Sequence, residues 1–244
     1  MNAEILLNPA PLLRSKSRSL LSGATRICTL IMSVAGGSVM AQALSSTCGP
    51  LENAYGPFDY RTAQDKLKIV EGAHFTAPVE ALIKGNAGYL GGDLDYTLRA
   101  SPNHHRALLA VMRFGEKTKS SQPPNLRYSV ECYFDRALRF RPDDSVARML
   151  YATFLAKQNR IPEASSQLSK TAALAGDNAF THYNVGLVYL DMKNYANALA
   201  QAHRAYSLGF KKAELKDRLQ KLGRWKDADP LPPENPASDS GATP

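Results

Sequence analysis

The chain has 244 residues, of which 44% are hydrophobic, and its formal net charge at pH 7 is +8. This length allows one large or two small domains. The positive charge alone would admit a nucleic-acid partner, but the basic residues are scattered, without interleaved aromatic residues and without a nucleic-acid-binding motif. We therefore expect no nucleic acid, and we interpret the charge as a solvated surface with a second use in attracting acidic partners or anionic surfaces.

Residues 1–41 have the order of a secretory signal peptide. Basic residues lie ahead of an apolar stretch at 27–40, and small residues suited to cleavage follow around Ala41. We therefore expect export to the periplasm. The alternative is that the segment stays uncleaved and anchors the protein to the inner membrane, although the stretch is short for a spanning helix. No later apolar run has a comparable length, so we expect no integral membrane domain after cleavage.

Residues 42–100 are predicted to be an irregular N-terminal segment. Gly-Pro pairs near its start indicate turns, and residues 84–92 are rich in glycine, which indicates a flexible loop. Thr76 and Pro78 have the pattern of a helix start, so a short helix is expected to run from there to Ile83. We expect the segment to pack on the helices that follow it.

Cys48 and Cys132 are the cysteines that remain once Cys28 leaves with the signal peptide. In an oxidising compartment two cysteines favour one disulfide. It would close a loop of about 84 residues and stabilise the fold by ~4 kcal/mol in the chain-entropy model. The alternative is two free thiols, one of them buried as a small apolar group. We expect the disulfide.

Titratable residues between 71 and 105 are the candidates for chemistry. His104 and His105 are adjacent, so on a helix they point about 100° apart and do not readily face one metal ion. No H-x3-H or H-E-x-x-H spacing is present, and the glycine-rich stretch lacks the Lys-Ser or Lys-Thr of a phosphate-binding loop. We therefore predict no catalytic site, metal or cofactor, and the alternative is an envelope enzyme or metal-binding protein with its site in residues 71–105. The residues that such a site would use are Glu71, His74, Asp93, Asp95, His104 and His105.

Residues 145–212 contain one pattern twice, and the second copy follows the first at an offset of 34. Small residues recur at fixed places, as Ala152 and Gly186 do in the first expected helix of each copy, and Ala164 and Ala198 in the second. Helices approach closely only where side chains are small, and such a period is typical of stacked helix–turn–helix units. The other matched pairs are Leu155 and Tyr189, Ile161 and Tyr195, and Leu174 and Leu208.

The second copy resembles the tetratricopeptide repeat. The family pattern W-x2-L-G-x2-Y followed by A-x3-F-x2-A-x4-P is met at Gly186, Tyr189, Ala198 and Ala205. The copy departs from the pattern at His182, Val185, Ala202 and Phe210.

The resemblance extends upstream of the two copies. Val130-x3-Phe134-x2-Ala137-x4-Pro142 looks like the second half of a further unit, and Ser101–Gly115, with Ser101 as helix cap and Pro102 opening the helix, like its first half. Residues 116–126 would then be an insertion. Longer stretches, such as Val70–Thr76 and Asp95–His105, are similar to a group of exported bacterial proteins of this architecture, a likeness that carries no activity with it.

The resemblance implies an all-α fold, with about three helix–turn–helix units and a cap helix in residues 101–225. The cap helix would contain Leu215, Leu219 and Leu222. Residues 226–244 are rich in Pro, Ser, Asp and Gly and offer almost nothing to bury, so we expect a disordered tail.

The resemblance also implies a binding surface, because first helices of tetratricopeptide units line a concave groove. We therefore expect a scaffold or adaptor that binds a peptide segment or an envelope protein, as a component of an envelope complex. Asn184 stands where clamp-type arrays use an Asn to bind a peptide backbone or carboxylate, and Lys157 would add charge; the alternative is that Asn184 is only a solvated helix residue. The expected groove residues are Met149, Thr153, Lys157, Tyr183, Asn184, Leu187 and Asp191.

Overall fold

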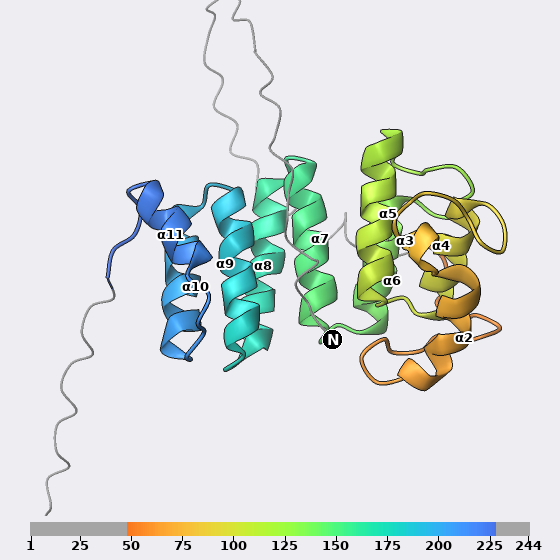
Figure 1. The fold of residues 1–244 in the computed structure, drawn as a ribbon, viewed down its shortest axis with the longest axis horizontal. Helices are drawn as coiled ribbons and strands as arrows, with labels where there is room; N and C mark the ends of the chain where they lie inside the picture. The colour runs from red at the N-terminus through yellow and green to blue at the C-terminus, as the bar shows by residue number, and fades with distance from the viewer. Residues whose placement is uncertain (1–47, 228–244) are drawn as a thin grey trace, which may run out of the picture. The chain divides into compact units, whose positions relative to one another are not determined.

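The computed structural model describes residues 48–227, and these residues form helices and no strand (Figure 1). The all-α prediction is therefore confirmed for this part of the chain. The predicted signal peptide at 1–41 and all but the first two residues of the predicted tail at 226–244 lie outside the described residues. None of the described helices is long and apolar enough to cross a membrane.

The chain divides into two compact units after Pro142. The first unit holds α2 (Gln64–His74), α3 (Ala77–Glu80), α4 (Leu90–Ala100), α5 (His105–Thr118) and α6 (Val130–Phe140). The second unit holds α7 (Ser145–Lys157), α8 (Ile161–Ala175), α9 (Ala179–Asp191), α10 (Tyr195–Ser207) and α11 (Glu214–Lys221). The boundary predicted after residue 100 falls inside the first unit, because α4 packs directly on α5.

The segment predicted to be irregular instead carries three helices, α2, α3 and α4. Leu67 and Val70 stand three residues apart in α2, and Leu94 and Leu98 stand four apart in α4, so each pair forms an apolar stripe on its helix. All four side chains are buried, and α2 packs against α4. Each stripe has only two apolar residues among polar ones, and this weak periodicity is why the sequence left α2 undecided and did not predict α4.

Only part of the glycine-rich stretch at 84–92 is a loop, because its last residues form the first turn of α4. A Cβ added at Gly91 would lie 2.0 Å from the carbonyl oxygen of Pro124. Only glycine therefore lets α4 pass so close to the connection between α5 and α6.

The short helix α3 begins after Thr76, as predicted, but ends at Glu80 and not at Ile83. Leu82 has a φ of 56°, a left-handed conformation that a right-handed helix cannot continue through. The chain therefore leaves the helix after a single turn.

Helix α5 begins later than predicted. Ser101 follows the end of α4, and its backbone N–H donates to the carbonyl oxygen of Thr97 at 2.8 Å, so it does not cap α5. The cap is His104, whose Nδ1 accepts the backbone N–H of Ala107 at 3.2 Å. The predicted insertion starts only after Thr118, where α5 ends.

The second unit is built around α9. This helix contacts α7, α8, α10 and α11, and every residue from 181 to 190 is buried. The most extensive contacts are those between α9 and α10 and between α7 and α8 (Figure 1). A helix with partners on all sides is expected to be apolar around most of its circumference, as α9 is.

The geometry of α7 and α8 recurs in α9 and α10 at the offset seen in the sequence. Helices α7 and α9 begin at Ser145 and Ala179 and both have 13 residues. Helices α8 and α10 begin at Ile161 and Tyr195, which stand at the same offset from each other. The sequence period is therefore also the period of the helix starts.

Finer details repeat with the same period. Asn159 and Lys193 lie in the two connections and have φ angles of 60° and 61°. One side-chain contact between the helices of each pair also recurs on equivalent positions. Arg148 Nη1 donates to Gln167 Oε1 at 2.8 Å, and His182 Nδ1 and Gln201 Oε1 are 2.7 Å apart.

A second, different offset relates α4 to α6, and the sequence interpretation missed it. Both helices have 11 residues, and they begin at Leu90 and Val130. Each has the same internal ion pair near its end, Asp95 with Arg99 at 2.8 Å and Asp135 with Arg139 at 2.7 Å. The repeated local structure therefore begins further upstream than the predicted units, at α4.

Candidate functional site

The residues predicted to line a groove lie on α7 and α9, which contact each other in the second unit. These residues differ in their accessibility to solvent. Met149, Tyr183, Asn184 and Leu187 are buried, with exposed fractions between 3% and 6%. Thr153 is half-buried, whereas Lys157 and Asp191 are exposed. A partner could therefore contact mainly the last three side chains on this surface, which we call the α7/α9 face.

The side-chain amide of Asn184 forms a hydrogen bond within its own helix. Its Nδ2 donates to the carbonyl oxygen of Phe180, one turn earlier in α9, at 2.9 Å. The amide nitrogen carries a second N–H, but the Asn184 side chain lies in a residue that is only 6% exposed. Asn184 is thus placed on the predicted helix but is largely buried.

Tyr183 packs into the second unit. Its ring centroid lies 4.3 Å from that of Phe210, in the connection between α10 and α11. Burial raises the pKa of Tyr183 to about 12, so the phenol stays neutral at physiological pH. Its role in the structure is to hold this connection against α9.

Asp191 forms an ion pair with a residue of α11. Its Oδ1 lies 2.5 Å from Arg218 Nη2, and both side chains are about one-third exposed, at 34% and 38%. Pairs of this exposure contribute about 0–1 kcal/mol to stability. The pair therefore places two opposite charges at the edge of the α7/α9 face and contributes little to the stability of the fold.

The titratable residues of the first unit form two separate histidine–carboxylate pairs. His74 Nδ1 lies 2.8 Å from Asp93 Oδ1, and the buried Asp93 also accepts the backbone N–H groups of Asn86 and Ala87 through Oδ2. The ring of His74 stacks on Tyr96, with centroids 4.0 Å apart. Asp93 thus fixes the orientation of an imidazole at the end of α2.

The second pair is buried more deeply. His104 Nε2 lies 2.9 Å from Glu71 Oε1, and the His104 side chain has no exposed surface. Because Nδ1 accepts the Ala107 N–H, the ring proton sits on Nε2 and is donated to Glu71. Burial lowers the pKa of His104, and the hydrogen bond from His104 lowers the pKa of Glu71.

The other two candidates for chemistry have structural partners of their own. Asp95 accepts the hydroxyl of Tyr133 at 2.7 Å, and the ring of His105 lies edge-on to Tyr60. Within residues 48–227, no three His, Cys, Asp or Glu side chains are grouped so that they could hold one metal ion. The three candidate carboxylates, Glu71, Asp93 and Asp95, therefore each have a different neighbour as partner.

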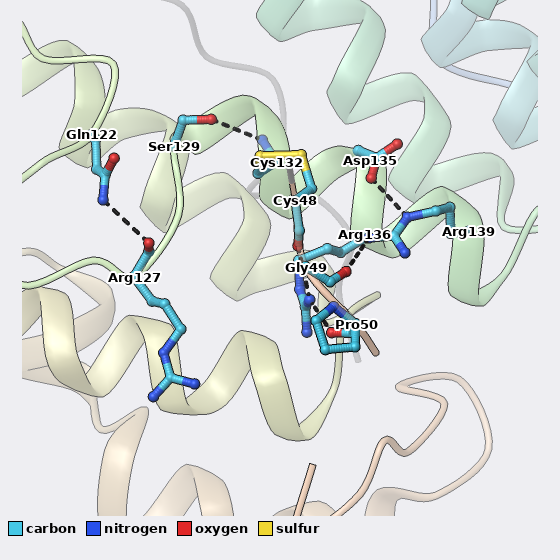
Figure 2. The surroundings of a disulfide bond; sticks show 10 residues. All are labelled: Cys48, Gly49, Pro50, Gln122, Arg127, Ser129, Cys132, Asp135, Arg136 and Arg139. Atoms are coloured by element: carbon cyan, nitrogen blue, oxygen red, sulfur yellow. Dashed lines mark hydrogen bonds and ion pairs between the residues drawn. A yellow bond between two sulfur atoms is a disulfide. The ribbon is translucent and has the colours of Figure 1, made fainter. Parts of the chain in front are cut away.

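Cys48 and Cys132 form the predicted disulfide, with an S–S distance of 2.08 Å and a Cα–Cα distance of 5.0 Å (Figure 2). The bond joins the first described residue to α6. Cys132 lies in the first turn of that helix, where its backbone N–H donates to the N-cap oxygen of Ser129. The covalent link therefore starts from a capped and fixed helix end.

Two arginines of α6 reinforce this link, and sequence reasoning missed both. Arg136 Nη1 donates to the carbonyl oxygens of Cys48 and Pro50, and Arg139 Nη2 donates to that of Gly49 at 2.9 Å (Figure 2). Arg136 is only 1% exposed, and its guanidinium lies 4.7 Å from the ring centroid of Tyr128. The signal available in the sequence was their helical spacing behind Cys132, which places them beside the bonded segment.

A further buried carboxylate, Asp59, ties the segment before α2 to the turn before α5. It accepts hydrogen bonds from Arg61 and from Nδ2 of Asn103, and Arg141 Nε lies 2.8 Å from it. The hydrogen bonds from Arg61, first, and from Asn103 hold the pKa of Asp59 well below its usual range. The arrangement satisfies a buried charge fully and leaves it no spare role in proton transfer.

Comparisons of the chain with protein-family models, with curated proteins and with solved structures gave no match.

Proposed function

We propose that the protein is an exported interaction scaffold, built from tetratricopeptide-type repeats, that binds a peptide segment or an envelope protein along the α7/α9 face. The observation that carries the proposal is the periodic recurrence of helix starts, connection φ angles and interhelical side-chain contacts. Repeat arrays of this kind expose long helical faces to partners, and each repeat contacts only its neighbours. The signal-peptide pattern of residues 1–41 supports the proposed export to the periplasm.

Helix α11 supports this interpretation as the cap of the array. Leu215 and Leu219 are fully buried on one side of it, and the rest of the helix is polar. A Cβ at Gly186 would lie 2.6 Å from Leu215 Cδ2, so α9 and α11 approach at a position where the repeat uses glycine. Leu222, expected in the same stripe, follows the helix and is half exposed.

The contact surface of the proposed scaffold is defined by its accessible residues. Lys157 and Asp191 are exposed at the C-terminal ends of α7 and α9, and Thr153 lies one turn before Lys157. The buried Met149, Tyr183 and Leu187 support the face from beneath. Partner binding would therefore depend on charge at the two helix ends more than on Asn184.

Site-specific photocrosslinking in cells tests the proposal. A photoreactive residue replaces Lys157, and a matched control replaces Lys170, which is exposed on α8. We expect a discrete crosslinked partner from position 157 and none from position 170. The Asp191→Lys exchange should reduce that crosslink, whereas an equal yield from both positions would show that the face has no special role.

A second candidate function, metal binding or catalysis in residues 71–105, has one observation in its favour. His74 is oriented by Asp93 through Nδ1, and its Nε2 has no hydrogen-bond partner among the described residues. A carboxylate-oriented imidazole is a frequent device in metal and acid–base sites. Titration of the full chain with Zn²⁺, compared with His74→Gln, tests it. Binding that is lost in the variant would support a site at His74, and identical isotherms would count against it.

A further inference from the structure

A hollow of about 450 Å³ lies between the end of α10, the connection to α11 and the segment after α11. None of the residues that line it belongs to the α7/α9 face. Half of the residues that line it have aromatic rings, and two others are lysines. The residues that the argument uses are His203, Tyr206, Phe210, Lys211, Lys216 and Trp225.

The walls of this hollow are held in place by bonds within the unit. Tyr206 donates its hydroxyl proton to the carbonyl oxygen of Lys212 at 3.0 Å and accepts the backbone N–H of Lys216 at 3.1 Å. Trp225 donates its indole N–H to Asp227 at 3.0 Å, and His203 bonds the carbonyl oxygen of Lys226. The polar atoms of the rings are thus satisfied, and their partly exposed apolar surfaces face the hollow.

The rings form a corner and not a flat slot. The Trp225 and His203 rings lie at 89° to each other with centroids 5.0 Å apart, and Tyr206 meets Trp225 at 64°. Stacking a nucleic-acid base needs one open flat ring face. A corner of rings suits a compact saturated group, and aromatic-lined grooves of this kind bind proline-rich segments in the extended polyproline conformation.

The residues that line the hollow include two lysines and no carboxylate, and Asp227 beside it is engaged by the Trp225 indole N–H. Among residues 48–227, neither Lys211 nor Lys216 has a carboxylate within ion-pair distance, and the Lys216 ammonium lies 5.0 Å from the Trp225 ring centroid. The nearby Glu214 lies 3.8 Å from Arg218 and so has a partner on its own helix. A ligand that pairs with both lysines must carry negative charge.

We propose that this hollow binds an acidic, proline-containing peptide segment of a partner protein. A volume of about 450 Å³ falls within the ~300–1,000 Å³ range of ligand sites and has room for a few residues. Proline rings occupy the corner between Trp225 and His203, and a flanking carboxylate pairs with Lys211 and Lys216. The proposal concerns a different surface from the α7/α9 face and stands or fails independently of it.

The sole tryptophan of the chain reports on the hollow directly, because Trp225 is part of its wall. Three synthetic peptides of equal length serve as probes: one acidic with prolines, one with its acids changed to amides, and one with its prolines changed to alanine. The full chain is titrated with each, and the emission of Trp225 is followed. We expect the acidic proline peptide to shift the emission and to bind about tenfold more tightly than either of the others.

Charge reversal then separates this site from general attraction to a basic protein. Lys211→Glu with Lys216→Glu should weaken the acidic proline peptide by about tenfold or more, whereas Lys170→Glu on α8 should not. Lys170 and Lys211 are exposed and Lys216 is half-buried, and far-UV circular dichroism checks that each variant is folded. Equal binding by the double variant and the wild type would overturn the proposal.

Other occupants would give different results, each of which overturns the proposal. Single-stranded RNA or anionic vesicles could shift Trp225 emission when the peptides do not. Residues 229–234 of this chain, Asp-Pro-Leu-Pro-Pro-Glu, also have the required chemistry. The variant in which Pro230, Pro232 and Pro233 of this chain are alanine tests that occupant. If Trp225 emission shifts in this variant without any peptide, and the variant binds the acidic proline peptide more tightly, the occupant is this chain and not a partner.

Discussion

Arg136 Nη1 donates a hydrogen bond of 3.1 Å to the carbonyl oxygen of Cys48, so the residue that forms the disulfide is also held through its backbone. Together with the bond from Arg139 to Gly49, this places covalent and non-covalent links on consecutive residues of one segment. The two kinds of link can be removed separately, which allows their contributions to be measured.

Replacement of Cys48 and Cys132 by serine should lower the free energy of unfolding by about 2–4 kcal/mol, because the loop of 84 residues is no longer closed in the unfolded chain. Urea denaturation followed by circular dichroism measures the loss. Dithiothreitol added to the wild type should produce the same shift of the midpoint and no further shift in the variant. A midpoint unaffected by both changes would mean that the bond does not constrain the unfolded state.

Arg136→Met should destabilise the fold by about 2–4 kcal/mol, since two carbonyl oxygens lose their donor inside the protein. The matched change Arg139→Met removes a partly exposed guanidinium and should cost about 1 kcal/mol or less. Both are read from the same urea transitions with the disulfide intact. Equal losses in the two variants would contradict the importance that we assign to burial of Arg136.

Acid should destabilise the protein through His104. Burial lowers its pKa in the folded state below the unfolded value of about 6.5, so the unfolded chain binds the extra proton more readily. This contribution to stability is complete above about pH 6.5 and is lost as the pH falls towards the folded pKa. A charged ring would also lose the Nδ1 acceptor that caps α5. Thermal unfolding between pH 8 and pH 5 measures the effect.

His104→Asn is the informative variant for this dependence, because Asn is a good helix cap but does not titrate in this range. It should flatten the decline of Tm below pH 6.5. His203→Asn removes a partly exposed histidine instead and should leave the decline as in the wild type. Loss of Glu71 ionisation belongs to a more acidic window, because the His104 hydrogen bond lowers the pKa of Glu71 in the folded state below its ordinary value of 4.5.

Gly186→Ala should destabilise the second unit by about 1–3 kcal/mol, because its Cβ would lie 2.6 Å from the buried Leu215 side chain. Gly72→Ala in α2 provides a control of opposite sign. A Cβ there meets nothing within 4 Å, and alanine favours a helix over glycine by about 0.5–1 kcal/mol. Differential scanning fluorimetry of the two variants tests the contrast, which would vanish if α11 did not pack on α9.

The sequence predicted the helical character of residues 101–225, the period of the second unit and the disulfide. Gly186 and Ala198 must be small because the helices touch there. Small residues that recur at a fixed spacing can be recognised in the sequence, so the period could be predicted. The disulfide followed from the number of cysteines and the expected compartment. None of these inferences needed knowledge of which side chains meet.

The sequence did not reveal α2 and α4 or the accessibility of the groove residues. Leu94 and Leu98 are separated by polar residues whose partners come from distant parts of the chain, as Asp95 finds Tyr133. The burial of Tyr183 depends on Phe210, which follows the next helix. Such contacts arise from tertiary packing, and the spacing of residues along the sequence does not predict them.

The disulfide has a consequence for protein that has been cut. The exposed connection after Thr118 lies between Cys48 and Cys132, so a protease that cleaves there separates the backbone but not the molecule. On a denaturing gel the nicked chain would run as one band without reductant and as two with it. A cut in this connection would therefore leave both fragments joined and the second unit still attached to the start of the described chain.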